Sequence, residues 1–220
     1  MSQLIKPENF DKSKLSLSSV RTYGNGKLIY INYDEKKNVD LITPSIRFPF
    51  GVNKFESDNG GCKYDLTLSL DNMEDASIKS FYTCIKQVDE FIKEEARKNS
   101  LTWFKKRDAS HEVINALFTD SIKQKDSYSP VIKTKITEYN NEFKIAVYDD
   151  KANTLYPNEQ NDSSAFLNKI KRNGRGVAII SPSVVWISNS RFGITWKLTQ
   201  LKVNTVVDQS TYSFLDEDSD

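Results

Sequence analysis

The hydrophobic pattern of this 220-residue chain changes period twice, and this constrains its fold more than any other feature. Residues 64–70 alternate between apolar and polar side chains, as a half-buried strand does. From residue 78 to residue 92 the apolar side chains recur at spacings of three and four, which is the period of an amphipathic helix. Alternation returns after Pro130. This order predicts a mainly β fold of the α+β class with a helical insertion.

Tight turns separate the predicted strands. Gly24-Asn25-Gly26 joins residues 16–23 to residues 28–33 in a hairpin, and Asn140-Asn141 joins residues 131–139 to residues 142–148 in another. A strand is expected over residues 41–46, ended by Pro49 and Gly51. Further elements are expected as a loop over 150–164, a helical turn over 165–171, and strands over 177–180, 184–187 and 192–198.

The helical insertion is expected to span about residues 75–120. Its long helix has Asp75 as N-cap and stops near Asn99-Ser100, and a shorter helix begins at Ser110. Strands and tight turns around one long helix favour a Greek-key barrel. The five-stranded oligonucleotide-binding (OB) type accepts a helix between its strands, but composition does not distinguish it from other small barrels. We predict one domain over residues 1–206 and a disordered acidic tail over residues 207–220.

Composition bears on several functional classes. No apolar stretch approaches the ~18 residues that cross a bilayer, and the N-terminus lacks a secretion signal, so we expect an intracellular protein without a membrane partner. Cys62 and Cys84 lack metal-ligand spacing and are expected to be reduced and structural. His111 is the one histidine in the sequence. We therefore expect no metal site and no cofactor.

Charge is divided unevenly, although the net charge is only +1. All 31 basic residues and 25 of the 30 acidic residues precede residue 203, so this part carries +6. The rest carries −5, from Asp208, Asp216, Glu217, Asp218 and Asp220. Like charges repel and stay solvated, so such a tail is typical of an interaction segment. A frayed terminus without function is the alternative.

Aromatic residues lie beside cations in three segments, and this favours a nucleic-acid partner. The segments are Arg47-Phe48-Pro49-Phe50 with Lys54, Trp103-Phe104-Lys105-Lys106-Arg107, and Arg191-Phe192 with Trp196-Lys197. Unpaired bases stack on aromatic rings, and phosphates need a basic groove. Arg172 and Arg175 lie in a glycine-containing turn. Such a basic turn is usually just solvated charge, but here it is expected to add phosphate contacts.

Each of these aromatic residues also has a purely structural interpretation. Alternation along residues 192–198 places Trp196 inside and Lys197 outside. Phe48 and Phe50 fit an anchor onto the barrel as well as a contact with bases. The three cations after Trp103-Phe104 keep that segment at the surface, so we expect at least one of its two rings to contact the ligand.

Signatures of catalysis are weak. Gly24-Asn25-Gly26-Lys27 lacks the spacing and the Ser or Thr of a phosphate-binding loop. Asp34-Glu35 and Asp149-Asp150 are adjacent carboxylates in polar loops, whereas acid–base or two-metal catalysis needs carboxylates that converge from different elements. We predict that the protein is not an enzyme. A magnesium-dependent nucleic-acid-processing enzyme that uses these carboxylates is the least favoured alternative.

Three segments carry a family resemblance through their order and spacing. They are Pro49-Phe50-Gly51, Thr102-Trp103-Phe104-Lys105-Lys106, and Phe192-Gly193-Ile194-Thr195-Trp196-Lys197-Leu198 before the acidic tail. Over nearly its whole length the chain resembles the single-stranded DNA-binding proteins of nucleocytoplasmic large DNA viruses, which are similar to the podovirus replication protein family. The resemblance implies an OB barrel with an inserted long helix, binding without strong sequence preference, a homodimer and no catalytic residues.

The resemblance also implies a tail that contacts DNA polymerase, helicase or primase. The phage relatives end this tail on an aromatic residue, whereas here Tyr212 and Phe214 precede the acidic cluster of Asp216, Glu217, Asp218 and Asp220. Five negative charges on a tether can occupy a basic groove, so the tail is also expected to mask the DNA site.

Together these features predict a sequence-nonspecific single-stranded DNA-binding protein of viral DNA replication and recombination. It is expected at sites of viral DNA replication in the host cell, with the virion as a second location. A viral structural or adaptor protein whose barrel does not bind nucleic acid is the main alternative.

Overall fold

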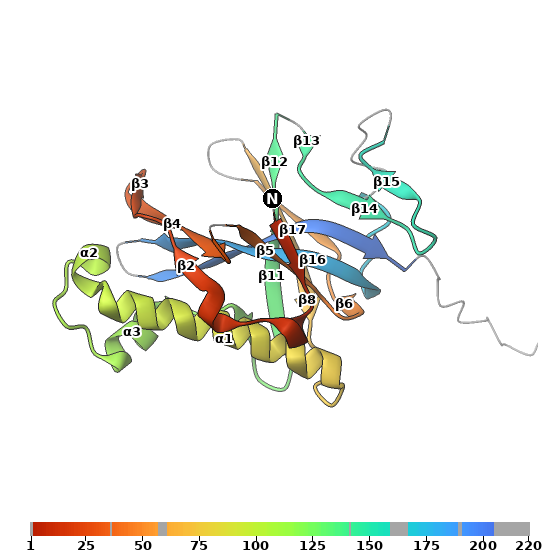
Figure 1. Ribbon diagram of the computed structural model, residues 1–220. Helices are drawn as coiled ribbons and strands as arrows, with labels where there is room; N and C mark the ends of the chain where they lie inside the picture. The colour runs from red at the N-terminus through yellow and green to blue at the C-terminus, as the bar shows by residue number, and fades with distance from the viewer. Residues whose placement is uncertain are drawn as a thin grey trace, which may run out of the picture.

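The computed structural model describes residues 2–35, 37–56, 61–140, 142–158, 167–188 and 191–204. Within these ranges the chain forms one large sheet of many strands and a separate two-stranded sheet. Three α-helices lie between residues 69 and 131 (Figure 1). The predicted mainly β fold with a helical insertion is therefore confirmed.

The elements have the following bounds. The first strands are β1 (Ser2–Ile5), β2 (Leu15–Leu17), β3 (Arg21–Tyr23), β4 (Gly26–Tyr33), β5 (Asn38–Ile42), β6 (Ile46–Phe48), β7 (Val52–Glu56) and β8 (Cys62–Ser69). Two 3-10 turns, η1 (Pro7–Asn9) and η2 (Lys12–Lys14), lie near the N-terminus. The helices are α1 (Ala76–Lys98), α2 (Ser100–Phe104) and α3 (His111–Leu117). The later strands are β9 (Phe118–Thr119), β10 (Ile122–Lys123), β11 (Val131–Ile136), β12 (Glu138–Tyr139), β13 (Glu142–Phe143), β14 (Ala146–Tyr148), β15 (Thr154–Tyr156), β16 (Gly174–Ile187) and β17 (Phe192–Val203).

Five strands pair in a closed circuit. β6 pairs with β16 and with β8, β8 pairs with β11, β11 pairs with β17, and β17 pairs with β16. Among these five pairs, β11–β17 is parallel and the other four are antiparallel. Leu66, Ile132 and Trp196 are buried on three of these strands. The position of Trp196 inside the fold, expected from alternation, is therefore confirmed.

β16 is a single strand of 14 residues, so the prediction of two strands over 177–180 and 184–187 is wrong. Pro182 lies within it, next to a shift in register between Pro182 and Val184. A proline has no N–H to donate to a ladder, and a bulge is where a sheet accepts one. Beyond the circuit, β16 also pairs with β4 and β5.

The strand predicted over residues 41–46 is divided into β5 and β6. Thr43 exchanges hydrogen bonds with Ala178 of β16, and Pro44 then interrupts the pairing because it has no N–H. The loop predicted over 150–164 contains β15, which pairs with β14. Residues 159–164 of that prediction lie outside the described ranges.

α1 begins and ends close to the predicted residues. The Asp75 carboxylate accepts hydrogen bonds from the backbone N–H groups of Ser77 (2.7 Å) and Ile78 (3.3 Å). The apolar stripe of the helix is buried, and in Figure 1 the helix lies along one side of the sheet with α2 and α3 at one end. No helix in the described part of the chain has the length and apolar character to span a membrane.

Candidate nucleic-acid interface

A groove of about 960 Å³ lies between segments that are far apart in the sequence. It is formed by the end of β6 and the loop after it, by residues 118–131, and by two arginines near the ends of β16. Its lining residues are Arg47, Pro49, Phe50, Ser69, Phe118, Thr119, Asp120, Ile122, Lys123, Gln124, Lys125, Tyr128, Ser129, Val131, Arg172, Asn173 and Arg191. This site is referred to below as the groove.

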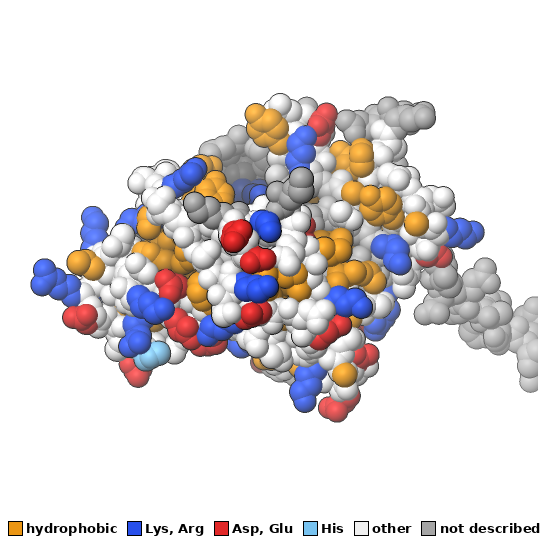
Figure 2. Space-filling model, in the orientation of Figure 1, with side chains coloured by type: hydrophobic (Ala, Val, Ile, Leu, Met, Phe, Trp, Pro, Cys, Tyr) orange, Lys and Arg blue, Asp and Glu red, His pale blue; other side chains and the backbone are white. Residues whose placement is uncertain are grey.

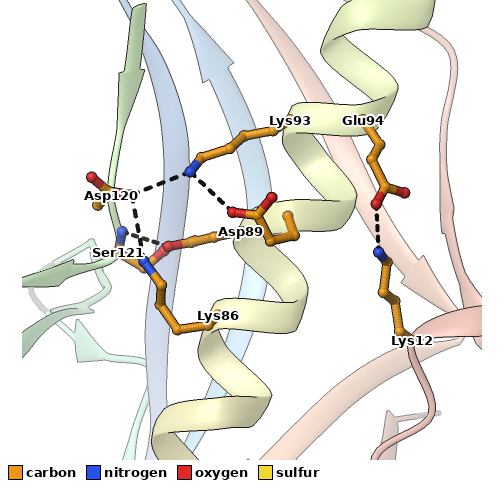
Figure 3. A network of polar contacts seen from close by, with 8 residues as sticks. Lys12, Lys86, Asp89, Lys93, Glu94, Asp120 and Ser121 are labelled. Carbon is orange, nitrogen blue, oxygen red and sulfur yellow. Dashed lines mark hydrogen bonds and ion pairs between the residues drawn. The ribbon is translucent and has the colours of Figure 1, made fainter. Parts of the chain in front are cut away.

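The groove is strongly basic. Five of its lining residues are cations, and one is a carboxylate, Asp120. By contrast, cations and carboxylates are interspersed over the face of the molecule shown in Figure 2. Asp120 lies 3.8 Å from Lys86 and 3.6 Å from Lys93, both on α1 (Figure 3). Its charge is therefore balanced from the helix side, and the groove keeps a net positive charge.

Arg47 is held in a fixed position at one end of the groove. Its Nε donates to Asp71 (2.7 Å), its Nη1 to Asn173 (3.1 Å) and its Nη2 to Ser69 (3.4 Å). Arg175, the register partner of Arg47 on β16, donates to the same Asp71 oxygen at 3.2 Å. Two guanidinium groups thus share one carboxylate, and the cluster of Arg47, Arg175 and Asp71 keeps one unit of positive charge.

Two exposed aromatic rings lie on the groove. Phe50 is 57% exposed and Tyr128 is 72% exposed, whereas Phe118 is buried. Gly51, next to Phe50, has a φ of +68°, and a Cβ there would come within 2.8 Å of the Ile170 carbonyl oxygen. Only glycine adopts such a turn without strain, and the turn keeps Phe50 at the surface.

The segment from Asp120 to Lys123 is fastened to α1 by a buried network. Asp89 of α1 accepts hydrogen bonds from the backbone N–H of Ser121 (3.1 Å) and from its hydroxyl (2.5 Å) (Figure 3). The Ser121 hydroxyl in turn accepts from the Trp196 indole N–H at 2.7 Å. Burial raises the pKa of Asp89 to about 6. The helical insertion therefore positions one wall of the groove.

A row of lysines continues the groove along the sheet. Ser69 and Val131 are register partners that line the groove, and Lys133 and Lys135 follow Val131 at two-residue intervals on the same face of β11. Lys197 is the register partner of Lys135. We call Lys133, Lys135 and Lys197 the lysine row.

Lys133 of the lysine row contacts an aromatic ring and a carboxylate. The Lys133 ammonium lies 5.0 Å from the ring centre of Phe55 and 3.2 Å from the Asp65 carboxylate. Phe55 is half-exposed, so its ring is available at this face.

Four of the predicted site residues line the groove: Arg47, Phe50, Arg172 and Arg191. Lys197 belongs to the lysine row, and Arg175 reaches Asp71 beside the groove. Lys54 lines a smaller hollow next to it.

Two predicted contacts with the ligand are corrected, because the rings are buried. Phe48 is 1% exposed and lies against Gly174 and Gly176 of β16, which leave room for its ring. Trp103 is 4% exposed and packs edge-on against Phe192. Phe104 is half-buried, with its ring centre 5.0 Å from that of Phe192.

The cations that follow Trp103 do not line the groove. Lys105, Lys106 and Arg107 are exposed beyond the end of α2, where Lys105 has a left-handed backbone. Lys27 of β4 donates to the carbonyl of Trp103 at 3.1 Å and holds this helix against the sheet. The three cations are thus at the surface, as the sequence predicted, but the neighbouring Trp103 ring is buried and the Phe104 ring is half-buried.

Sequence reasoning missed Lys123, Lys125 and Tyr128. These three residues fall within six positions of one polar segment just before Pro130. They repeat the combination of cations and an aromatic ring that was used to select the other segments. The signal was present, but the cations and the ring are not adjacent.

The candidate catalytic carboxylates lie in separate turns. Asp34 and Glu35 follow β4 with positive φ angles, and Asp149 accepts hydrogen bonds from Lys151 and Asn153 in the turn between β14 and β15. Among the described residues, no three His, Cys, Asp or Glu side chains group as a metal site requires. His111 is exposed at the start of α3, and both cysteines are free.

The tail residues Tyr212, Phe214, Asp216, Glu217, Asp218 and Asp220 lie outside the described ranges. Their expected role in binding partners stays a prediction.

Comparison with solved structures finds distant likenesses. A C-terminally truncated single-stranded DNA-binding protein from bacteriophage Enc34 is 16% identical with a TM-score of 0.45, covering 87% of this chain and 95% of that one. The Enc34 protein without this truncation is also 16% identical, with a TM-score of 0.45, and the match covers 86% of this chain and 89% of that one. The single-stranded DNA-binding protein gp2.5 of bacteriophage T7 is 11% identical, with a TM-score of 0.41, and the match covers 75% of this chain and 85% of that one.

Comparison with curated proteins finds no match. A family model does match, over residues 69–216, which is more than half of the chain. The matched range includes β11, β16, β17 and the three helices, but not Arg47 and Phe50. The chain therefore belongs to the family described as "Family of unknown function (DUF5871)".

Proposed function

We propose that this protein binds single-stranded DNA without sequence preference, in the groove and along the lysine row. The observation that carries the proposal is the groove itself, which is lined by five cations and two exposed aromatic rings. Phosphates along a strand are held by cations, and unpaired bases stack on rings at ~1–3 kcal/mol each. Stacking accepts every base, because every base has a π-face.

The circuit of strands supports the same proposal. Five strands closed in this way, with a helical insertion between the second and the third, fit an OB barrel. OB barrels bind oligonucleotides on the outer face of their second and third strands. In chain order these are β8 and β11, and the lysine row lies beside the groove on the same face of β11. The proposed barrel and the proposed site therefore agree in position.

We further propose a role in viral DNA replication and recombination inside the host cell, with the protein coating single strands as a homodimer. The acidic tail would recruit a DNA polymerase, helicase or primase and compete with DNA for the groove. Its charge of −5 against +6 in the rest of the chain supports this competition.

Fluorescence anisotropy with a labelled dT oligonucleotide tests the binding proposal. We expect saturable binding that weakens with salt at a log–log slope of about −0.7 for each phosphate neutralised. Duplex DNA, RNA of the same length and heparin serve as competitors. The proposal would be contradicted if heparin abolished binding of the labelled oligonucleotide and competing dT did not. Equal affinities for duplex and single-stranded DNA would contradict it as well.

A further inference from the structure

A second hollow of about 330 Å³ adjoins the groove. It is lined by Phe50, Gly51, Val52, Lys54, Tyr64, Leu167, Ile170 and Arg172. β7 and β8 contribute Val52, Lys54 and Tyr64, while Leu167, Ile170 and Arg172 come from the segment that leads into β16. We call this site the side hollow.

The lining of the side hollow has the parts that one nucleotide requires. Phe50 and Tyr64 offer aromatic rings, Lys54 and Arg172 offer positive charge, and Val52, Leu167 and Ile170 make an apolar floor. None of its lining residues is acidic. Within the described ranges Lys54 has one carboxylate at ion-pair distance, that of Glu56, which lies 4.0 Å away and is itself exposed. An anionic group attached to a flat apolar ring matches the positive charge and the aromatic and apolar side chains of this lining.

Phe50 and Arg172 line both the groove and the side hollow. These two residues therefore form the ridge between the two sites. The left-handed turn at Gly51 fixes the ridge, since the chain passes too close to Ile170 for any side chain at that position. A polymer that fills both sites passes these two shared residues.

We propose that the side hollow holds one further nucleotide of the strand bound in the groove, and that the Phe50 ring separates its base from the preceding base. This inference rests on the proposed function and adds to it a cause of strand selectivity. Two successive bases on opposite sides of a ring cannot both stay stacked in a duplex. The ridge therefore favours unpaired strands over paired ones.

Three variants test the inference. Val52→Trp fills the side hollow, Phe50→Ala removes the ridge, and Lys54→Ala removes an exposed cation without disturbing the core. Leu4→Trp is the matched control, because Leu4 is 58% exposed and lines neither site. Urea unfolding of each variant confirms that it is folded before binding is measured.

We expect Val52→Trp to weaken binding of a dT oligonucleotide about 5- to 150-fold, the equivalent of one stacked base, and to shorten the occluded length by one nucleotide. Phe50→Ala should lower the ratio of single-strand to duplex affinity. Lys54→Ala should reduce the salt slope by about 0.7. Leu4→Trp should bind as the wild type does.

Two outcomes separate this inference from the proposed function. If the wild type binds no single strand, the proposed function fails and the inference fails with it. If the wild type binds and Val52→Trp and Lys54→Ala match it in affinity, occluded length and salt slope, the inference alone is overturned. If Val52→Trp does not fold, the salt slope of Lys54→Ala decides.

Discussion

At the scale of single residues, the cations of the groove differ in how firmly they are held. Arg47 is fixed by Asp71, Asn173 and Ser69. Lys123, Lys125, Arg172 and Arg191 have no carboxylate within ion-pair distance in the described part of the chain. Arg47 therefore suits a contact of defined geometry, whereas the other four can adapt to phosphates at varied positions.

A comparison of two triple variants tests where DNA binds. Lys123→Ala, Lys125→Ala and Arg172→Ala together should reduce the salt slope of binding by about 2, from the loss of three phosphate contacts. Lys105→Ala, Lys106→Ala and Arg107→Ala remove the same charge from the end of α2 and should change the slope much less. Equal effects of the two triples in anisotropy titrations would show that only net charge matters.

Tyr128→Ala tests the contribution of stacking. Its ring is among the most exposed in the molecule and lies on the groove. We expect the affinity for dT oligonucleotides to fall by ~1–3 kcal/mol with no change in salt slope, because no charge is lost. Tyr23→Ala, at an equally exposed tyrosine that lines no described hollow, is the control. A loss of the same size in both variants would contradict a specific role for Tyr128.

At the scale of elements, α1 acts as the support of the groove wall. Asp89 binds Ser121, and Lys86 and Lys93 reach Asp120, so two successive residues of the wall are tied to successive turns of the helix. This arrangement places the Asp89 carboxylate inside the protein, and burial raises its pKa from 3.8 to about 6.

This buried carboxylate predicts a pH dependence of stability. Between pH 4 and pH 6 the folded protein keeps a proton on Asp89 that the unfolded chain has released. The bound proton therefore makes its full favourable contribution to the free energy of unfolding below about pH 4. This contribution is lost as the pH rises through 6, which lowers the free energy of unfolding by about 3 kcal/mol. Asp89→Asn should remove this component of the pH profile.

Urea unfolding of the wild type and of Asp89→Asn at several pH values between 4 and 7 measures the effect. The difference in free energy of unfolding between the two should change with pH in favour of the variant as the pH rises. Asp126→Asn, at an exposed position, is the control. A difference that stays constant over this range would show that burial does not perturb Asp89.

The elements also show what the sequence could and could not predict. α1 was predictable with its N-cap, because a long helix repeats its period many times and Asp75 marks its start. The continuity of β16 was not predictable, because a proline such as Pro182 interrupts most strands. The shift in register next to Pro182 is what allows the strand to continue through it. The burial of Trp103 was missed because α2 is only five residues long, too short for periodicity to assign its faces.

At the scale of the whole molecule, the separation of charge predicts an effect of the tail. Deletion of residues 208–220 removes five negative charges and no positive ones. If the tail competes for the groove, the truncated protein should bind dT oligonucleotides several-fold more tightly at low salt, with the difference vanishing at high salt.

A full-length variant with Asn or Gln at the five acidic tail positions is the matched control, since it keeps the chain and loses the charge. It should behave like the truncated protein. Unchanged or weaker binding by both proteins would count against competition by the tail.

The small strand β6 has a consequence for any attempt to divide this protein. It is three residues long, yet it pairs with both β16 and β8 and carries Arg47 to the edge of the groove. A fragment limited to residues 69–216, the range that the family model matches, would lack β6. Such a piece would also lack β8 except for Ser69, so β16 would lose its pairing with β6 and β11 its pairing with β8. Arg47 and Phe50 would be missing as well, and we therefore expect the matched range not to fold by itself.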